Sequence, residues 1–233
     1  MTTPDATPVV PDAPTAQAAT CFGANLHAAQ RYVALLADTG VSHGLIGPRE
    51  VPRLWTRHVL NCAVVAELVP TGERVIDIGS GAGLPGIPLA LARLDLEVVL
   101  VEPLQRRVAW LSHAVDELGL ANVKVHRGRA EDLPASMRSS VVTARAVARL
   151  GRLATWCAPV VSPGGRLLAL KGDSAAMELA QDRAAVRRAG FVGGTVRRVG
   201  TGVVDPPTTV VECLRGQGQA SPSGARTRSG GRG

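Results

Sequence analysis

The sequence is poor in aromatic residues and in cysteine. Phe, Trp and Tyr make up only 3% of the 233 residues, so a base-stacking sheet of the RRM or OB type is not expected. No C-x-x-C pair and no His/Cys cluster occurs among the four cysteines, which are Cys21, Cys62, Cys157 and Cys213. This scatter argues against a zinc site or a disulfide framework, and it favours a reducing cytoplasm. We therefore expect no metal centre.

The sequence also lacks a long apolar run. No stretch reaches the roughly 18 apolar residues that a membrane helix requires, so we expect no membrane partner. The first residues have neither a basic segment nor an apolar one, and they do not resemble a signal peptide. Two biased segments are predicted to be disordered: residues 1–18, rich in Pro, Thr and Ala, and residues 216–233, rich in Gly, Ser and Arg.

Acidic residues are outnumbered by basic ones. The formal net charge is +7, and a positive excess remains when both terminal segments are left out. A polyanionic partner such as a nucleic acid is consistent with this charge.

Between the two tails, the pattern predicts one domain over residues 19–215. Helical spacing of apolar residues covers residues 15–38 and 50–69, so residues 19–70 form N-terminal helices. Within residues 71–215, short β-branched runs then alternate with amphipathic stretches such as 105–118. This alternation predicts an α/β fold with a mostly parallel sheet covered by helices on both faces.

The stretch VIDIGSGAGLPGIP, residues 75–88, fits two ligand-binding patterns. From Gly81 it matches G-x-G-x-x-G, which is typical of dinucleotide sites, and from Asp77 it matches D-x-G-x-G-x-G, which is typical of S-adenosylmethionine sites. Pro85 would remove an N–H from the helix start that a pyrophosphate needs, and the Asp77 carboxylate would repel that group. The second pattern, with Gly79, Gly81 and Gly83 approaching the ligand, is therefore favoured.

Acidic residues follow three consecutive predicted strands. Asp77 ends the first, Glu102 ends the second, and Glu131 lies just past the third. Strand ends meet at one edge of a parallel sheet, where α/β proteins bind ligands. Glu102 suits ribose hydroxyls, Asp77 suits a cationic amino-acid end, and Glu131 suits an adenine. This ordered set predicts S-adenosylmethionine as the cofactor.

Several motifs together resemble the RsmG family, also called GidB. They are DIGSGAGLPGIPLA, RAED after the third strand, ARAVA after the fourth, LLALKG after the fifth, and the upstream LWTRHVLNC. The resemblance covers roughly residues 50–172. It implies a class I methyltransferase, Rossmann-like, with a seven-stranded sheet and extra N-terminal helices. It also implies methylation of a guanine N7 in 16S rRNA of the small ribosomal subunit. We expect a monomer.

By this resemblance, individual residues acquire expected roles. Donor contacts fall on Gly79, Leu84, Ala130, Glu131 and Arg145, in addition to Asp77, Gly81, Gly83 and Glu102 from the arguments above. Contacts to RNA or guanine fall on Arg57, His58 and Lys171, and Arg145 and Lys171 are the candidates for catalysis. The chain departs from the family pattern at Asn61–Cys62, where Asp–Ser is common, so no acidic role is assigned there.

The chemistry of N7 methylation agrees with what the sequence lacks. Guanine N7 has a free lone pair, so no cysteine nucleophile is required, and Cys157 and Cys213 are predicted to be buried apolar residues. Trp55, Trp110 and Trp156 are predicted to be core. Three alternatives remain: a class I methyltransferase for another acceptor, an NAD(P)-binding oxidoreductase, and a non-catalytic protein that binds ribosomes.

Overall fold

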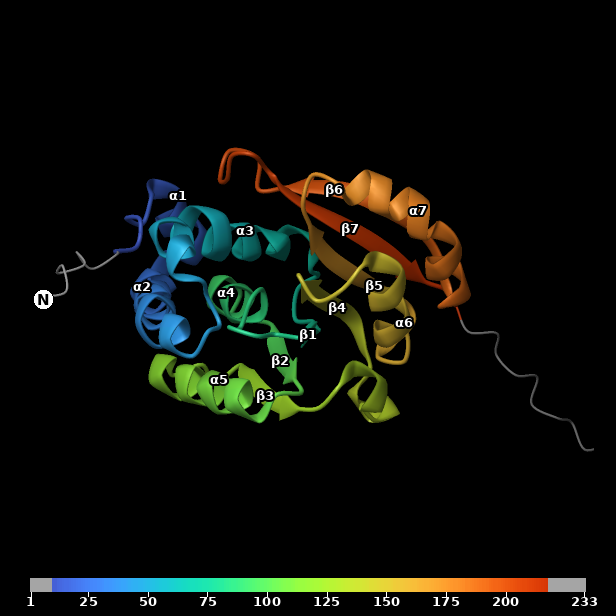
Figure 1. The fold of residues 1–233 in the computed structure, drawn as a ribbon, viewed down its shortest axis with the longest axis horizontal. Coiled ribbons are helices and arrows are strands. Elements are labelled where there is room, and N and C mark those ends of the chain that lie inside the picture. Colours follow the sequence, from blue (N-terminus) through green and yellow to red (C-terminus); the bar gives the residue numbers. More distant parts are fainter. Residues whose placement is uncertain (1–9, 218–233) are drawn as a thin grey trace, which may run out of the picture.

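A seven-stranded sheet forms the centre of the computed structural model, which describes residues 10–217 (Figure 1). Its order is β3-β2-β1-β4-β5-β7-β6. Neighbours among the first five strands pair in parallel, and β7 runs antiparallel to β5 and β6. The strands are β1 (Arg74–Ile78), β2 (Glu97–Glu102), β3 (Val123–Arg127), β4 (Ser139–Arg145), β5 (Val161–Lys171), β6 (Phe191–Val199) and β7 (Thr208–Arg215). The predicted mostly parallel, seven-stranded α/β fold is confirmed.

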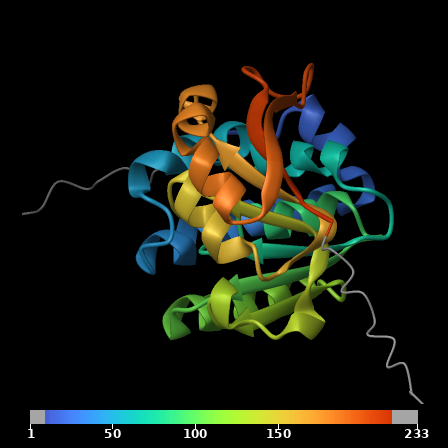
Figure 2. The same ribbon diagram turned by 90° about the vertical axis from the view of Figure 1, so that its right-hand side faces the viewer.

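Helices cover both faces of the sheet because the buried strands alternate their side chains between two cores. In β1, Val75 belongs to one core and Ile76 to the other. The first core packs against α1 (Ala16–Phe22), α2 (Leu26–Leu35), α3 (Leu60–Ala63), α4 (Gly86–Ala92) and α5 (Gln105–Leu118). The second packs against α6 (Leu150–Cys157) and α7 (Ala175–Arg188), which Figure 2 turns toward the viewer.

The N-terminal helices lie where the apolar spacing predicts them, but they are broken into short pieces. Gly23, with a φ of 49°, separates α1 from η1 (Gly23–Asn25) and α2, and η2 (Leu36–Gly40) completes the first segment. The second segment ends before Pro70, which cannot continue a helix. It consists of η3 (Pro48–Arg53), η4 (Leu54–Val59), α3 and η5 (Val64–Leu68). No helix among residues 10–217 is long and apolar enough to cross a membrane.

The structure differs from the predicted end of the N-terminal tail at residue 18. α1 already begins at Ala16, and Ala18 is fully buried. The carboxylate of Asp12 also accepts hydrogen bonds from the backbone N–H groups of Trp55 (2.8 Å) and Thr56 (3.0 Å). A contact over more than forty residues leaves no local pattern, so composition alone placed the boundary too late. Residues 1–9 and 218–233 of the predicted tails lie outside the described part.

Two of the three tryptophans are core residues as predicted. Trp55 and Trp110 are 2% and 4% exposed. Trp156 is different, because it is only half-buried and lines a cavity at the sheet edge. It also packs against the second core, so its assignment to the core is right only in part: the helical spacing identified the inward side of α6 but could not show that a cavity opens there.

Candidate functional site

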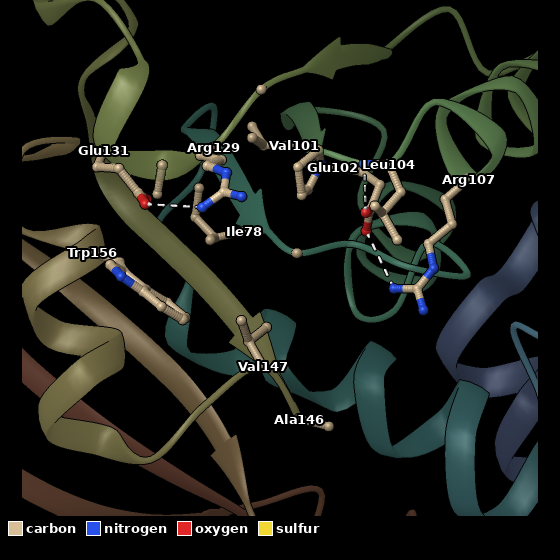
Figure 3. A pocket seen from close by; sticks show the side chains of 14 residues that line it. Ile78, Val101, Glu102, Leu104, Arg107, Arg129, Glu131, Ala146, Val147 and Trp156 are labelled. Carbon is tan, nitrogen blue, oxygen red and sulfur yellow. Dashed lines mark hydrogen bonds and ion pairs between the residues drawn. The ribbon is translucent and has the colours of Figure 1, made fainter.

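The first candidate site is a cavity of about 400 Å³ at the carboxyl ends of β1 to β4. We call it the donor cavity. Figure 3 shows Glu102, Leu104 and Arg107 on one side of it, and Glu131 and Trp156 on the other. Its remaining lining residues are Ile78, Gly79, Val101, Pro103, Gly128, Arg129, Ala130, Ala146 and Val147. The cavity thus lies at the edge where α/β sheets bind ligands.

Gly79 brings the backbone of the β1–α4 loop to the wall of the donor cavity. Its N–H donates to the carbonyl of Val101 (2.8 Å) and its φ is +68°. A Cβ at this position would lie 2.7 Å from Cγ2 of Val147, so both the conformation and the space require glycine. Gly81 and Gly83 also have positive φ, but they and Leu84 do not line the cavity.

Asp77 is turned away from the donor cavity and holds the loop from behind. It is fully buried, and its two carboxylate oxygens accept from Gly86 N–H (3.2 Å) and from the Thr143 hydroxyl (3.2 Å). Burial raises the pKa of Asp77 to about 7. A direct contact with a cationic ligand stays a prediction that the cavity lining does not support.

Glu102 is the carboxylate that reaches the donor cavity. It is 1% exposed, and its oxygens accept from the N–H groups of Gly81 (3.1 Å) and Leu104 (3.0 Å). Arg107 lies 3.7 Å away through Nη1. These contacts fix the carboxylate while leaving acceptor capacity for ribose hydroxyls.

Arg107 offers a test of whether the cavity fits a polar ligand. Its Nε is buried and has no hydrogen-bond partner among the described residues, and such an orphaned donor is uncommon without a ligand or water. Apolar side chains of the same cavity, including Val101, Leu104 and Trp156, suit a flat heterocycle. The residues present therefore fit a nucleoside with a polar extension, as S-adenosylmethionine has.

The end of β3 contributes the opposite wall. Ala130 begins η6 (Ala130–Asp132) and is buried, whereas Glu131 is exposed and its carboxylate lies 4.0 Å from Nη1 of Arg129. Both predicted residues of RAED thus line the donor cavity. Sequence reasoning missed Trp156 and Arg107 as lining residues. The paired arginines Arg106 and Arg107, at the start of the helix that follows the second strand, were a signal for Arg107.

A second cavity of about 400 Å³ adjoins the first, and we call it the acceptor cavity. Three cations and no carboxylate are among the residues that line it, which are Arg57, Asn61, Arg145, Ala146, Leu170, Lys171, Gly172 and Thr208. Ala146 lines both cavities and has a φ of 55°, which is unusual for a residue other than glycine. Strained backbone of this kind often marks a functional site.

Two of the three predicted substrate residues line the acceptor cavity, and the third does not. Lys171 lines the acceptor cavity, and its ammonium donates to the carbonyl of Ala148 and to Glu178, both at 2.8 Å. Arg57 lines it with a side chain that is 57% exposed. His58 does not line it and is 8% exposed.

Arg145 lies at the acceptor cavity, although it was predicted to contact the donor. Its guanidinium donates to Nδ1 of His58 (2.5 Å), to the carbonyl of His58 (3.4 Å) and to Sγ of Cys62 (3.0 Å). No carboxylate among residues 10–217 pairs with it within 4.0 Å. The side chain is therefore oriented by the N-terminal helices.

No nucleophilic cysteine faces either cavity. Cys157 and Cys213 are fully buried as predicted, and burial raises the pKa of both thiols, to about 11 for Cys213. Among the described residues, no group of three or more His, Cys, Asp or Glu is placed to hold a metal ion.

Known proteins resemble this chain over nearly its full length. It is 54% identical to the ribosomal RNA small subunit methyltransferase G of Salinispora arenicola, over 98% of both chains. It is 55% identical to the protein of that name from Streptomyces avermitilis, over 93% of this chain and 90% of the relative. The crystal structure of the S-adenosylmethionine-dependent methyltransferase SibL has the same fold, with a TM-score of 0.57 and 19% identity, over 87% of this chain and 70% of SibL.

The family model described as rRNA small subunit methyltransferase G matches residues 25–202. That range contains the β1–α4 loop, every lining residue of the two cavities except Thr208, and the N-terminal helices that orient Arg145. The predicted resemblance is thereby confirmed, and the chain belongs to the GidB family of rRNA small subunit methyltransferases G.

Proposed function

We propose that this chain transfers a methyl group from S-adenosylmethionine to N7 of a guanine in 16S rRNA of the small ribosomal subunit. One observation carries the proposal within the family: the donor cavity and a cationic cavity meet at Ala146. A methyl donor in the first cavity would face a nucleotide in the second across this wall. The names of the relatives support small-subunit rRNA as the source of that nucleotide.

The donor site is proposed from the residues that line it. Glu102 would accept hydrogen bonds from the ribose hydroxyls, and the backbone at Gly79 would approach the amino-acid end. Ala130, Glu131 and Trp156 would surround the adenine. When bound, S-adenosylmethionine supplies an electrophilic methyl group on its sulfonium. Arg107 Nε would gain the polar partner that it lacks.

The acceptor chemistry asks little of the protein besides alignment. N7 of guanine carries a lone pair, so the enzyme needs no general base and no covalent intermediate. It must hold N7 about 3–3.5 Å from the methyl carbon, in line with the departing sulfur. A cation directly at N7 would oppose the positive charge that methylation creates. We therefore assign Lys171 and Arg57 to a phosphate or to the O6 edge.

Mass spectrometry of modified nucleotides tests this function. Small subunits from a strain that lacks the gene are incubated with the purified protein and S-adenosylmethionine, and 7-methylguanosine in the 16S rRNA is quantified. We expect one new 7-methylguanosine site in the 16S rRNA, which forms only when the wild-type protein is added. Persistence of the modification in the deletion strain, or its absence after incubation, would contradict the RNA assignment.

The alternatives predict other outcomes. Calorimetry with S-adenosylhomocysteine and with NADH separates a methyl-donor site from a dinucleotide site, and binding of NADH alone would overturn the proposal. Donor binding without turnover on subunits would indicate a non-catalytic protein or another acceptor. We also propose that the protein acts as a monomer in the cytoplasm, which sedimentation and cell fractionation would test.

A further inference from the structure

Three residues from separate segments form a continuous hydrogen-bonded line beside the acceptor cavity. Glu50 lies on η3, His58 on η4 and Arg145 at the end of β4. Nε2 of His58 lies 2.8 Å from Oε2 of Glu50, and Nδ1 lies 2.5 Å from Nη2 of Arg145. Both ring nitrogens of a residue that is 8% exposed are thus engaged within the protein.

The partners determine which nitrogen of the His58 ring carries a proton. A guanidinium has no acceptor, so Nδ1 must accept from Arg145, and the Nε2–H group donates to Glu50. This arrangement exists only while the imidazole is neutral. Burial lowers the pKa of His58, and the charge of Arg145 is the second cause of this lowering. Arg57 acts in the same direction and Glu50 acts against it, so the neutral form prevails near pH 7.

Arg145 depends on this line for its placement. Its other anchors are the His58 carbonyl and the Cys62 sulfur, which come from the same stretch of helix. The next residue in the chain, Ala146, is the wall shared by the two cavities. A change of the His58 side chain would remove the anchor of Nη2 and leave Arg145 held through Nη1 alone, at the point where donor and acceptor meet.

We propose that Glu50 and His58 are positioning residues that hold Arg145 at the wall between the two cavities, and that His58 does not contact RNA. This inference rests on the proposed function for its kinetic consequence. The geometry itself can be measured without turnover. It replaces the expectation that His58 contacts the substrate, and it assigns a role to Glu50, which sequence reasoning left without one.

Single-turnover methylation of undermethylated subunits across pH provides the kinetic test. Protonation of Nδ1 would place its N–H against the N–H of Arg145, two donors with no acceptor between them. We therefore expect the wild-type rate to fall on acidification below about pH 6.5, the ordinary histidine value. We call this fall the acid limb of the pH profile. Glu50→Gln keeps an acceptor for Nε2–H and removes the charge that raises the pKa of His58. It should move the acid limb to lower pH.

Arg57→Gln is the matched control, because it should shift the pKa of His58 in the opposite direction from Glu50→Gln. Arg57 lowers the pKa of His58, so its removal should move the acid limb to higher pH and also raise KM for subunits. His58→Phe should remove the acid limb and lower the rate at pH 8 by roughly 10- to 100-fold, the cost of a lost charge-assisted hydrogen bond. Its affinity for S-adenosylhomocysteine should stay within about two-fold.

Two results would overturn the inference. One is an acid limb that stays in place in both Glu50→Gln and Arg57→Gln. The other is a His58→Phe variant that raises KM for subunits at an unchanged rate, as a direct RNA contact would.

A nitrogen NMR titration of the full-length protein tests the positioning even if no subunit is methylated or His58→Phe does not fold. We expect His58 in the Nε2–H form, with a pKa that falls in Glu50→Gln. The Nδ1–H form, or an unchanged pKa, would overturn the positioning. Absence of methylation by the wild-type protein with the expected NMR result would contradict only the proposed function.

Discussion

At the scale of single residues, two buried carboxylates at neighbouring strand ends have different tasks. Asp77 and Glu102 are 0% and 1% exposed. The oxygens of Asp77 are directed to Gly86 and Thr143 behind the loop, whereas Glu102 lines the donor cavity. Substitutions of the two residues should therefore affect different measurements.

Glu102→Gln should weaken binding of S-adenosylhomocysteine by roughly 10- to 100-fold, measured by calorimetry. A carboxylate accepts both backbone N–H groups and still has capacity for ribose, but an amide would point its NH₂ at one of these donors. Glu97→Gln, at the opposite end of β2 and paired with Arg74 and Lys124, is the control. Equal affinities in the two variants would exclude Glu102 from the donor site.

Asp77 should make the stability of the protein depend on pH. Its pKa is about 7 in the folded protein, against 3.8 as the ordinary value, so the folded state keeps a proton that the unfolded state has released. Stability should fall as pH rises through this window, by up to roughly 3 kcal/mol between pH 5 and 8. Asp77→Asn should remove that slope in urea unfolding. The exposed Asp116→Asn should retain it, and a slope shared by all three proteins would contradict the assignment.

At the scale of elements, the β1–α4 loop is held from three sides. Asp77 holds it through Gly86, β2 holds it through Glu102, and the hydroxyl of Tyr32 on α2 donates to the carbonyl of Ala82 (2.7 Å). The N-terminal helices therefore contact the donor loop as well as Arg145. The N-terminal helices thus support both the loop beside the donor cavity and a residue that lines the acceptor cavity.

Gly79→Ala should disturb the loop far more than a glycine replacement with similar backbone geometry. Both Gly79 and Gly72 have φ near +70°, but a Cβ at Gly79 would meet Val147, whereas at Gly72 it would meet nothing within 4 Å. We expect Gly72→Ala to cost about 1 kcal/mol of stability and to leave donor affinity unchanged. Gly79→Ala should also lower donor affinity by at least roughly ten-fold, because the loop must move. Equal effects would show that only backbone strain matters.

At the scale of the whole molecule, the net charge is +7, and three of the basic residues line the acceptor cavity. Arg57 and Lys171 are 114 residues apart in the sequence, and no carboxylate is among the lining residues. Their attraction for a phosphate backbone should depend on salt, since binding releases counterions.

Affinity for small subunits should fall steeply as salt rises, whereas affinity for S-adenosylhomocysteine should change little. Lys171→Met and Arg57→Gln should each reduce the slope of log K against log salt by about 1. Lys124→Met removes an equal charge from β3, where Lys124 pairs with Glu97 away from both cavities, and should leave the slope unchanged. Filter binding over a salt series measures this, and identical slopes for all variants would contradict the proposed RNA surface.

The sequence by itself determined the elements and the edge of the sheet where the site lies. The elements and the site edge follow from local patterns: the periodicity of apolar residues, the glycine loop, and acidic residues at successive strand ends. The parallel sheet then brings Glu102, Ala130 and Glu131 to one cavity as expected. The family motifs narrowed this fold to one kind of methyltransferase, which the comparisons bear out.

Only the tertiary structure decided the direction of each side chain. Asp77 turns inward, Arg145 turns to the acceptor cavity, His58 turns to Glu50 and Arg145, and Trp156 lines the donor cavity. The physical reason is that a strand end fixes where a backbone lies, whereas the partner of a polar side chain is chosen by burial and by neighbours distant in sequence. Those neighbours leave no periodic signal along the chain.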